Sequence, residues 1–464
     1  MPTLLWLRTD LRTQNNPALN WAIAQNQPIL AVYIAEDTER PRGGASNWWL
    51  HHSLQSLSQT IPLHFAAGKA TEILPRLVQE YKIQNICWNR RYTASGIATD
   101  THLKSHFKSQ GLHIETFKAN LLHEPWDIKT QSGTDFKVFT PFWRACLAQL
   151  TTGVTPGHGW AEASHYAGFG APSLSPGLPS ATKSTFINNP SSLALNHLNL
   201  LPKKNWSQNW PTLWHPGEAG AHHRLHDFLQ TGLKGYAEGR NNPAQPHFSK
   251  LSPHLQWGEI SPQQIWQATQ ASNAPENDKA KFLSEIGWRE FSHHLLYHFP
   301  ALASQNFKAN FNAFPWATNP AHLRAWQRGL TGYPLVDAGM RELWQTGFIH
   351  NRVRMVVASF LIKHLQIDWR QGEAWFWDTL VDACPANNAA SWQWVAGSGA
   401  DAAPYFRIFN PIMQGQKFDP TGEYTRKWLP ELAKLPQEYL FCPWQAPTLV
   451  LHAAGVTLGE IYPH

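Results

Sequence analysis

The chain has few cysteines, and no two of them lie close together. The four residues Cys87, Cys146, Cys384 and Cys442 include no C-x-x-C pair. This spacing argues against a zinc site or a thioredoxin-type motif, and it disfavours an iron–sulfur cluster. Sparse free cysteine fits a reducing compartment best. We therefore predict no metal centre and a cytoplasmic location.

Charged residues are also scarce, at 15% of 464 residues, and 42% of the chain is hydrophobic, which argues against disorder. No apolar run approaches 18 residues, so we expect no membrane span. The start, Met1–Arg12, lacks the layout of a signal peptide. The formal net charge of 38 − 32 = +6 permits a nucleic-acid partner without proving one.

The first 120 residues lack both the G-x-G-x-x-G and the P-loop fingerprints of nucleotide-binding domains. They contain instead an alternation of short apolar runs with amphipathic stretches. The expected strands are Leu4–Leu7, Ile29–Ile34, Leu63–Phe65, Ile86–Trp88 and His113–Phe117. This alternation predicts right-handed β-α-β units, hence an α/β Rossmann-like domain with a parallel sheet over residues 1–130.

The pattern fails from about Thr155 to Pro211, where seven prolines are scattered among Ser, Asn and Gly. We interpret residues 131–205 as an interdomain linker. From Trp206 onward the strand signal disappears and helical periods recur, and 16 of the 24 tryptophans fall there. Residues 206–464 are therefore predicted to form an all-α domain. The expected helices are 219–229, 262–270, 279–298, 320–329, 335–346, 352–365 and 373–381.

Three segments of the helical part combine residues that suit a planar ligand. Glu285 precedes Trp288 by three residues, so an aromatic face and a carboxylate could line one pocket. The segment 350–355 (HNRVRM) places two arginines at a helix start, against the helix dipole, which a binding role could justify. Residues 387–399 join amides, small residues and two tryptophans, which suits a flat ring approached closely by backbone. Each segment could equally be ordinary core packing or a solvated helix end.

Two further features have weaker signals. The run Phe248–Pro253 offers hydroxyls and backbone N–H groups ahead of a helix, which can bind phosphate, although capping serines look the same. Basic residues come from separate segments, and only their assembly on one face would contact a phosphate backbone. These residues are Arg240, Arg289, Arg352, Arg407 and Lys417.

Taken together, the motifs resemble those of the photolyase/cryptochrome family along nearly the whole chain. The start WLRTDLR (6–12) with NPAL (16–19) is similar to the family's opening. The longest match runs from TGYPLVDAGMR (331–341) through HNRVRM (350–355), WQW (392–394), YFRIFNP (405–411) and KFD (417–419) to WLPEL (428–432). The resemblance implies an α/β antenna domain and a helical domain that holds FAD. It also implies light-driven splitting of pyrimidine dimers in DNA.

The resemblance assigns roles residue by residue. FAD would be held by Tyr236, Ser249, Lys250, Leu251, Ser252, Asp382 and Asn388, with Asn388 facing the flavin N5, beside Phe248 and Cys384. The lesion pocket would consist of Glu285, Trp288, Asn351, Met355 and Trp394, with aromatic faces for a flipped-out dinucleotide. Electron transfer to the flavin would use Trp392, Trp369 and Trp316. Contacts to the DNA strand would come from Arg240, Arg289, Arg352, Arg407 and Gln414.

The subfamily is decided by details of these motifs. Asn351, Met355 and Asn388 are similar to cyclobutane-dimer photolyases, whereas the segments 88–92 and 314–316 resemble plant-type cryptochromes. That mixture resembles class III photolyases, which use a folate antenna, with a class I enzyme as the other choice. We expect methenyltetrahydrofolate, or else a deazaflavin, and a monomer that acts on UV-damaged DNA. The rival interpretation is a blue-light photoreceptor of the same fold without repair activity.

Two positions depart from the family pattern. Phe248 stands where the family's phosphate loop has threonine, so one hydroxyl is missing. Cys384 stands where a second aspartate follows Asp382 by two residues, which removes a carboxylate near the flavin. FAD binding would then depend more on Ser249, Ser252 and backbone N–H groups, with altered redox tuning.

Overall fold

The computed structural model describes residues 1–36, 40–152, 186–188, 192–404 and 406–463. They form two compact units, the first made of Met1–Leu229 with Ser249–Pro300, and the second of Gln230–Phe248 with Ala301–His464. Within the described residues, no helix has the length and hydrophobicity that a bilayer crossing requires.

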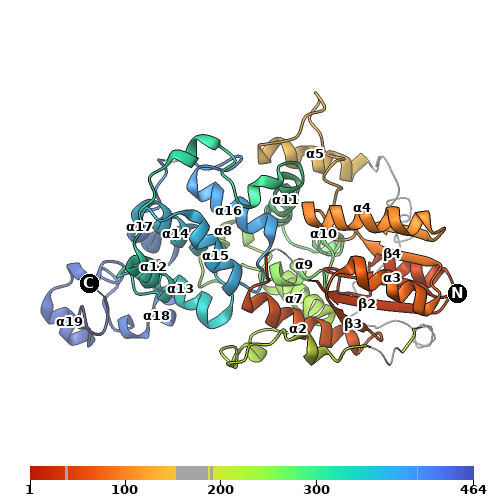
Figure 1. Cartoon of the computed structure of the whole chain (residues 1–464). Helices are drawn as coiled ribbons and strands as arrows, with labels where there is room; N and C mark the ends of the chain where they lie inside the picture. Colours follow the sequence, from red (N-terminus) through yellow and green to blue (C-terminus); the bar gives the residue numbers. More distant parts are fainter. Residues whose placement is uncertain (37–39, 153–185, 189–191, 405, 464) are drawn as a thin grey trace. The chain divides into compact units, whose positions relative to one another are not determined.

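The first unit contains the predicted α/β domain, which is confirmed. Five parallel strands are ordered β3-β2-β1-β4-β5 (Figure 1). They are β1 (Thr3–Leu7), β2 (Ile29–Ala35), β3 (His64–Ala67), β4 (Asn85–Asn89) and β5 (His113–Phe117). The connecting helices are α1 (Pro17–Ala24), α2 (Gly44–Ser58), α3 (Ala70–Tyr81) and α4 (Ala94–Ser109).

The central strands are buried on both faces, as parallel strands usually are. Trp6 of β1 and Trp88 of β4 pack edge to face, with ring centroids 5.7 Å apart, in the core that α3 and α4 complete. The neighbouring positions point to the opposite face, where the Cys87 thiol donates to the carbonyl of Ala18 in α1. Because successive side chains of a strand point to opposite faces of the sheet, Trp6 and Trp88 both point to the face that α3 and α4 cover.

Part of the predicted linker is folded, and residues 153–185 and 189–191 of it lie outside the described residues. Residues Phe139–Thr152 form helix α5, which packs on α11 (Glu276–His298). Its apolar positions 139, 142, 143 and 146 follow helical spacing, a signal that the prolines further along obscured. The domain boundaries at 130 and 206 stay predictions. The first unit also holds η2 (Leu195–Leu198), η3 (Trp210–Thr212), α7 (Glu218–Thr231, which ends in the second unit), α9 (Ser252–Gln256) and α10 (Pro262–Ala271).

In the described residues, the second unit is helical, as predicted. Short α8 (Tyr236–Gly239), α17 (Pro411–Phe418), α18 (Glu423–Trp428) and α19 (Thr448–Ala454) were not foreseen, because so few turns carry little periodicity. The longer helices are α12 (Pro320–Arg328), α13 (Pro334–Thr346), α14 (Asn351–Ser359), α15 (Trp369–Thr379) and α16 (Pro385–Ala396). The expected helix 352–365 ends in a π-helical turn, η6 (Phe360–His364).

Helices α15 and α16 approach closely at Gly372. A Cβ on this residue would lie 2.2 Å from Cη2 of Trp392, closer than any side chain could tolerate. The glycine therefore makes room for a buried tryptophan, 2% exposed, in the core of the second unit. This contact fixes the spacing of the two helices that flank the predicted flavin residues Asp382 and Cys384, and Asn388 lies on the second of these helices.

Candidate active site

The predicted site residues are divided between the two units. The first unit carries Ser249, Lys250, Leu251, Ser252, Glu285, Trp288 and Arg289, and the second carries the others.

Asn388 lies on α16, and its amide is held by Glu373 of α15. Its Nδ2 donates to the Glu373 carboxylate at 2.7 Å and to the Glu373 backbone carbonyl at 3.1 Å. Both side chains are buried, Asn388 at 7% and Glu373 at 5% exposure. Because both donors of the amide are used, its orientation is fixed and Oδ1 is the polar atom left for another group. Sequence analysis did not identify Glu373, since no motif distinguishes it from a surface carboxylate.

Asp382 lies between α15 and α16 and pairs with Arg354 of α14, whose Nη2 is 2.8 Å from the carboxylate. Arg354 also donates from Nε to the carbonyl of Ile349 at 2.8 Å, so its guanidinium is fixed from two sides. Cys384 is buried and occupies the N-cap position of α16. A thiol accepts hydrogen bonds weakly there, whereas an aspartate would cap the helix strongly.

Tyr236 and Phe248 come from the segment that contains α8. Tyr236 is buried, and the guanidinium of Arg240 lies 5.3 Å from the centre of its ring. Phe248 packs edge-on against His350, with ring centroids 5.3 Å apart. The family's missing hydroxyl is thus replaced by an aromatic contact to the residue that begins α14.

His350 caps α14, because its Nδ1 accepts from the backbone N–H of Arg352 at 3.2 Å. Asn351 is exposed, and Met355 and Trp394 are half-buried. The guanidinium of Arg352 donates to Asn241 at 2.7 and 3.2 Å. The start of α14, which the sequence predicted, therefore carries an exposed amide and an arginine whose orientation is fixed.

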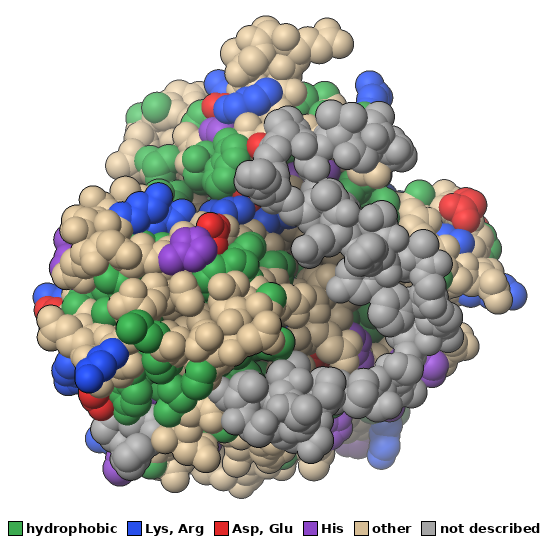
Figure 2. Space-filling view, turned by 90° about the vertical axis from the view of Figure 1, so that its right-hand side faces the viewer, with side chains coloured by type: hydrophobic (Ala, Val, Ile, Leu, Met, Phe, Trp, Pro, Cys, Tyr) green, Lys and Arg blue, Asp and Glu red, His purple; other side chains and the backbone are tan. Residues whose placement is uncertain are grey.

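Positive charges gather around this helix start. Burial, with the charges of Arg240 and Arg407, lowers the pKa of Arg352. Burial and the nearby arginines also lower the pKa of His350 to about 3, so its ring is neutral. Such mutual repulsion is relieved by a bound anion. A different face, the right-hand side of Figure 1, is drawn in Figure 2, and there too Lys and Arg side chains lie beside hydrophobic ones.

Two other predicted DNA contacts lie further along the second unit. Arg407 is exposed and lies between the exposed side chains of Phe406 and Ile408. Its backbone carbonyl accepts from Lys363 Nζ at 2.7 Å. Burial, and then the charge of Arg407, lowers the pKa of Lys363 to about 8. Gln414 is half-buried on α17.

The three predicted electron-transfer tryptophans belong to one apolar core. Trp392 and Trp369 are buried, at 2% and 1% exposure, and Trp316 is half-buried against the same cluster. The Trp369 Nε1–H donates to Asn306 at 2.9 Å. Trp316 is thus the most exposed of the three predicted residues.

In the first unit, the predicted phosphate loop leads into α9. Lys250 has a left-handed backbone with φ of 53°, and its ammonium group lies 5.6 Å from the centre of the Trp214 ring. Leu251 is buried, Ser249 is half-buried and Ser252 is exposed at the start of α9. Lys250 is therefore held over the Trp214 indole, while the hydroxyls of Ser249 and Ser252 lie near the surface.

Helix α11 carries the first unit's share of the predicted lesion pocket. Trp288 is half-buried and stacks on Phe139 of α5, with centroids 3.8 Å apart and planes within 9°. Glu285 is half-buried one turn earlier. Arg289 donates to the carbonyls of Asn120 at 2.7 Å and Leu255 at 3.5 Å, so its guanidinium already has partners inside the unit.

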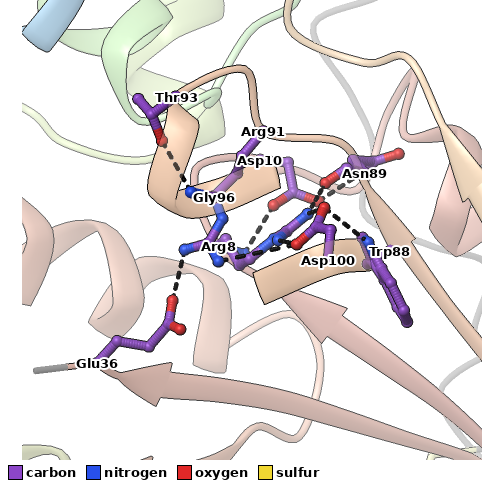
Figure 3. Close-up of polar contacts among 9 residues, drawn as sticks. All are labelled: Arg8, Asp10, Glu36, Trp88, Asn89, Arg91, Thr93, Gly96 and Asp100. Atoms are coloured by element: carbon purple, nitrogen blue, oxygen red, sulfur yellow. Dashed lines mark hydrogen bonds and ion pairs between the residues drawn. The ribbon is translucent and has the colours of Figure 1, made fainter. Parts of the chain in front are cut away.

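The carboxyl-terminal edge of the sheet holds a network that sequence analysis missed (Figure 3). Arg8 follows β1, is 5% exposed and bonds to both carboxylate oxygens of Asp100, at 2.5 and 3.2 Å. The same carboxylate accepts from Trp88 Nε1 at 2.9 Å. Ligands in open α/β sheets bind at this edge where the strand order reverses, here between β1 and β4. In this unit the ion pair between Arg8 and Asp100 occupies that edge of the sheet.

Sequence comparison identifies the family of both units. Residues 3–159 match the family described as DNA photolyase, and residues 282–464 match the FAD binding domain of DNA photolyase. The chain belongs to the DNA photolyase family. The resemblance that the motifs indicated is therefore confirmed, together with the fold class.

Individual photolyases and cryptochromes are similar along nearly the whole chain. A deoxyribodipyrimidine photo-lyase from Agrobacterium fabrum is 49% identical over 100% of this chain and 94% of its own. Cryptochrome-1 from Arabidopsis thaliana is 34% identical over 99% of this chain and 67% of its own. The crystal structure of a class III photolyase from Agrobacterium tumefaciens superimposes with a TM-score of 0.90 at 48% identity, covering 100% of this chain and 93% of that one. A Synechocystis cryptochrome gives 0.85 at 28% identity, covering 100% and 96%.

Proposed function

We propose that this chain is a light-dependent DNA repair enzyme that splits cyclobutane pyrimidine dimers, of the class III type. The observation that carries the proposal is the 49% identity with a deoxyribodipyrimidine photo-lyase over the full length of this chain. The plant cryptochromes that match are less similar, at 34% identity. We further propose that it acts as a monomer on UV-damaged DNA in the cytoplasm.

The buried polar groups of the second unit fit FAD, which when bound and reduced supplies the photoexcited electron for the reaction. Asn388 would present its carbonyl oxygen to a bound flavin ring, because Glu373 accepts both amide hydrogens. Arg354 orients the Asp382 carboxylate through an ion pair. Tyr236, Ser249, Lys250, Leu251 and Ser252 complete the binding set, with Phe248 and Cys384 as the two replaced positions.

The lesion pocket that we propose combines aromatic side chains with a carboxylate, an amide and a thioether. Trp288 and Trp394 offer faces on which a flipped-out dinucleotide stacks, and such stacking contributes about 1–3 kcal/mol per base. Glu285 and Asn351 bond to the polar edges of the bases, and Met355 contacts their apolar faces. Stacking of Trp288 on Phe139 supports this role, because it fixes the indole plane before DNA binds.

DNA binding depends on the cluster of positive charge at the start of α14. Burial, and then the charges of Arg240 and Arg407, lower the pKa of Arg352, and a phosphate would relieve the repulsion among the three arginines. Arg289 and Gln414 add polar contacts to the same strand.

The residues that would carry electrons from the surface to a bound flavin are Trp316, Trp369 and Trp392. The half-buried Trp316 is the surface end of this chain, and the other two tryptophans are buried in the core that it packs against.

The antenna that we propose is methenyltetrahydrofolate, with a deazaflavin as the alternative. The resemblance to class III enzymes supports the folate. Heat release of the bound chromophores, followed by mass spectrometry, distinguishes the two compounds directly. Detection of a deazaflavin alone would overturn the folate assignment and leave the repair proposal untouched.

The test of repair is an oligonucleotide with a single cyclobutane thymine dimer, incubated with the flavin-loaded protein in light and in darkness. We expect intact thymines only in light, and no repair of a (6-4) lesion in a parallel reaction. Tight flavin binding without repair of either lesion would favour the photoreceptor alternative.

A matched pair of arginine variants tests the DNA surface. Arg352→Ala should weaken binding to damaged and undamaged DNA alike, and the slope of log affinity against log salt should fall by about 1. Arg324→Ala removes the same charge from an exposed position on α12 and should keep the slope of the parent chain. Equal slopes for the two variants would exclude Arg352 as a phosphate contact.

A further inference from the structure

Two histidines and an aspartate meet in the first unit, and none of the three is assigned to flavin or DNA. His294 and His298 are four residues apart near the end of α11, and Asp135 lies in the segment before α5. One ring nitrogen of each histidine and a carboxylate oxygen of Asp135 lie within 4.8 Å of one another. We propose that these three side chains bind a divalent transition-metal ion, with Zn²⁺ as the preferred occupant.

Hydrogen bonds to one carbonyl fix the protonation of both rings. His294 Nδ1 lies 3.1 Å and His298 Nε2 lies 3.0 Å from the carbonyl oxygen of Pro125. A carbonyl only accepts, so each of these nitrogens carries the hydrogen. Metal-binding histidines almost always donate their second ring N–H in this way, which leaves the other nitrogen's lone pair for the metal.

The two remaining ring nitrogens are the atoms available to a metal ion. His294 Nε2 is buried in a residue that is 1% exposed, and within the described residues it has no hydrogen-bond partner. His298 Nδ1 faces the Asp135 carboxylate at 3.2 Å. In the neutral ring this nitrogen carries a lone pair that repels the carboxylate, and either a proton on Nδ1 or a metal ion between the two atoms removes that repulsion. Two ligand atoms at about 2.1 Å from one tetrahedral ion lie about 3.4 Å apart. The 3.2 Å between His298 Nδ1 and the Asp135 carboxylate is close to this spacing.

The donor set indicates which ions would bind. Imidazole nitrogens with a single carboxylate suit Zn²⁺, Ni²⁺, Co²⁺ or Cu²⁺ rather than Ca²⁺ or Mg²⁺, which prefer oxygen. Lys129 also pairs with Asp135 and is partly exposed, so an incoming ion would release its ammonium group to solvent. Three protein ligands leave a fourth tetrahedral position for water.

The site would fasten two segments that are distant in sequence. Phe136, next to Asp135, and Phe142 of α5 lie 6.5 and 5.0 Å from the His294 ring. Between them, Phe139 stacks on Trp288 of the same helix α11. A metal at Asp135 would therefore hold this aromatic layer against α11, a structural role rather than one in electron transfer.

The test measures Zn²⁺ binding to the flavin-loaded full chain after chelator treatment, by competition with a chromogenic chelator. We expect one tight ion per chain, and a loss in affinity of at least about 10-fold for Asp135→Asn, the least that loss of even an outer partner costs. Substitution of Co²⁺ should give the visible bands of a tetrahedral site, at wavelengths beyond those of the flavin.

Adventitious binding is a real competitor, because the chain has 24 histidines. The matched control is His102→Gln with His106→Gln, an i, i+4 pair on α4 whose rings stack 6.4 Å apart. This control should keep the tight ion. The proposal is overturned if the parent chain lacks a tight site, if Asp135→Asn binds equally well, or if the control loses the ion as fully as His298→Gln does.

Discussion

Replacing the amide of Asn388 with a carboxylate of the same shape should place two negative charges side by side in the core. In Asn388→Asp an oxygen replaces Nδ2, which lies 2.7 Å from the Glu373 carboxylate. Two unit charges about 3 Å apart repel by about 5.5 kcal/mol at an effective dielectric constant of about 20. This corresponds to about 4 pKa units, so the buried pair shares one proton near neutral pH.

The shared proton makes the stability of Asn388→Asp depend on pH. Between about pH 4 and pH 8 the folded pair holds a proton that the unfolded chain releases, so the free energy of unfolding falls as pH rises. Relative to the parent chain, the variant should lose about 5.5 kcal/mol across this window. Below it, the protonated acid can still donate to Glu373, and stability should approach that of the parent.

The assay is urea unfolding at saturating FAD from pH 4 to pH 9, scored as the difference between variant and parent. Asn387→Asp is the control, since it adds the same charge to the half-buried neighbouring position on α16. Its effect should be a stabilisation of about 0.3–1 kcal/mol from the helix dipole, with little pH dependence. A pH-independent difference for Asn388→Asp would refute the contact with Glu373.

Three further predictions concern buried groups. Trp369→Phe should remove most of the light-driven reduction of oxidised flavin but leave repair by chemically reduced protein intact. Trp326→Phe, at an equally buried position, should keep both activities. Equal photoreduction in the two variants would contradict the assigned pathway. Asp100→Asn should lower the free energy of unfolding in urea by about 3–5 kcal/mol, because the buried guanidinium of Arg8 loses its counter-charge. A loss below about 1 kcal/mol would show that the ion pair is not buried in solution. Burial raises the pKa of Glu290 to about 7, so the folded chain holds an extra proton and stability falls as pH rises from about 4.5 to 7. Glu290→Gln should flatten that slope in pH-dependent unfolding, and an unchanged slope would assign it to other groups.

The sequence was sufficient for the fold class and the family. Short apolar runs that alternate with amphipathic stretches allow few arrangements other than a parallel sheet with crossover helices. Strand positions agreed within a few residues because burial on both faces leaves a continuous apolar signal. The motif HNRVRM at 350–355 located the start of α14 because its capping residue, His350, is part of the motif itself.

Short or displaced elements were harder to predict from sequence. Helix α5 falls inside the range that we expected to be a linker. Its helical spacing of apolar residues was missed because the proline-rich stretch that follows dominates the pattern of that range. Helices of four to eight residues, such as α8 and α17, contain one or two turns, too few to show a period.

Only the tertiary structure decided which polar groups meet. Arg8 and Asp100 are 92 residues apart, Asn388 and Glu373 come from successive helices, and His294 meets Asp135 from a distant part of the chain. Local sequence preference reflects backbone propensity and burial pattern, which act over a few residues. Pairing of buried charges instead depends on which surfaces pack together, and an unpaired charge in the interior costs several kcal/mol. The sequence thus determined the family and the layers, and the packed fold determined the partners of its buried polar groups.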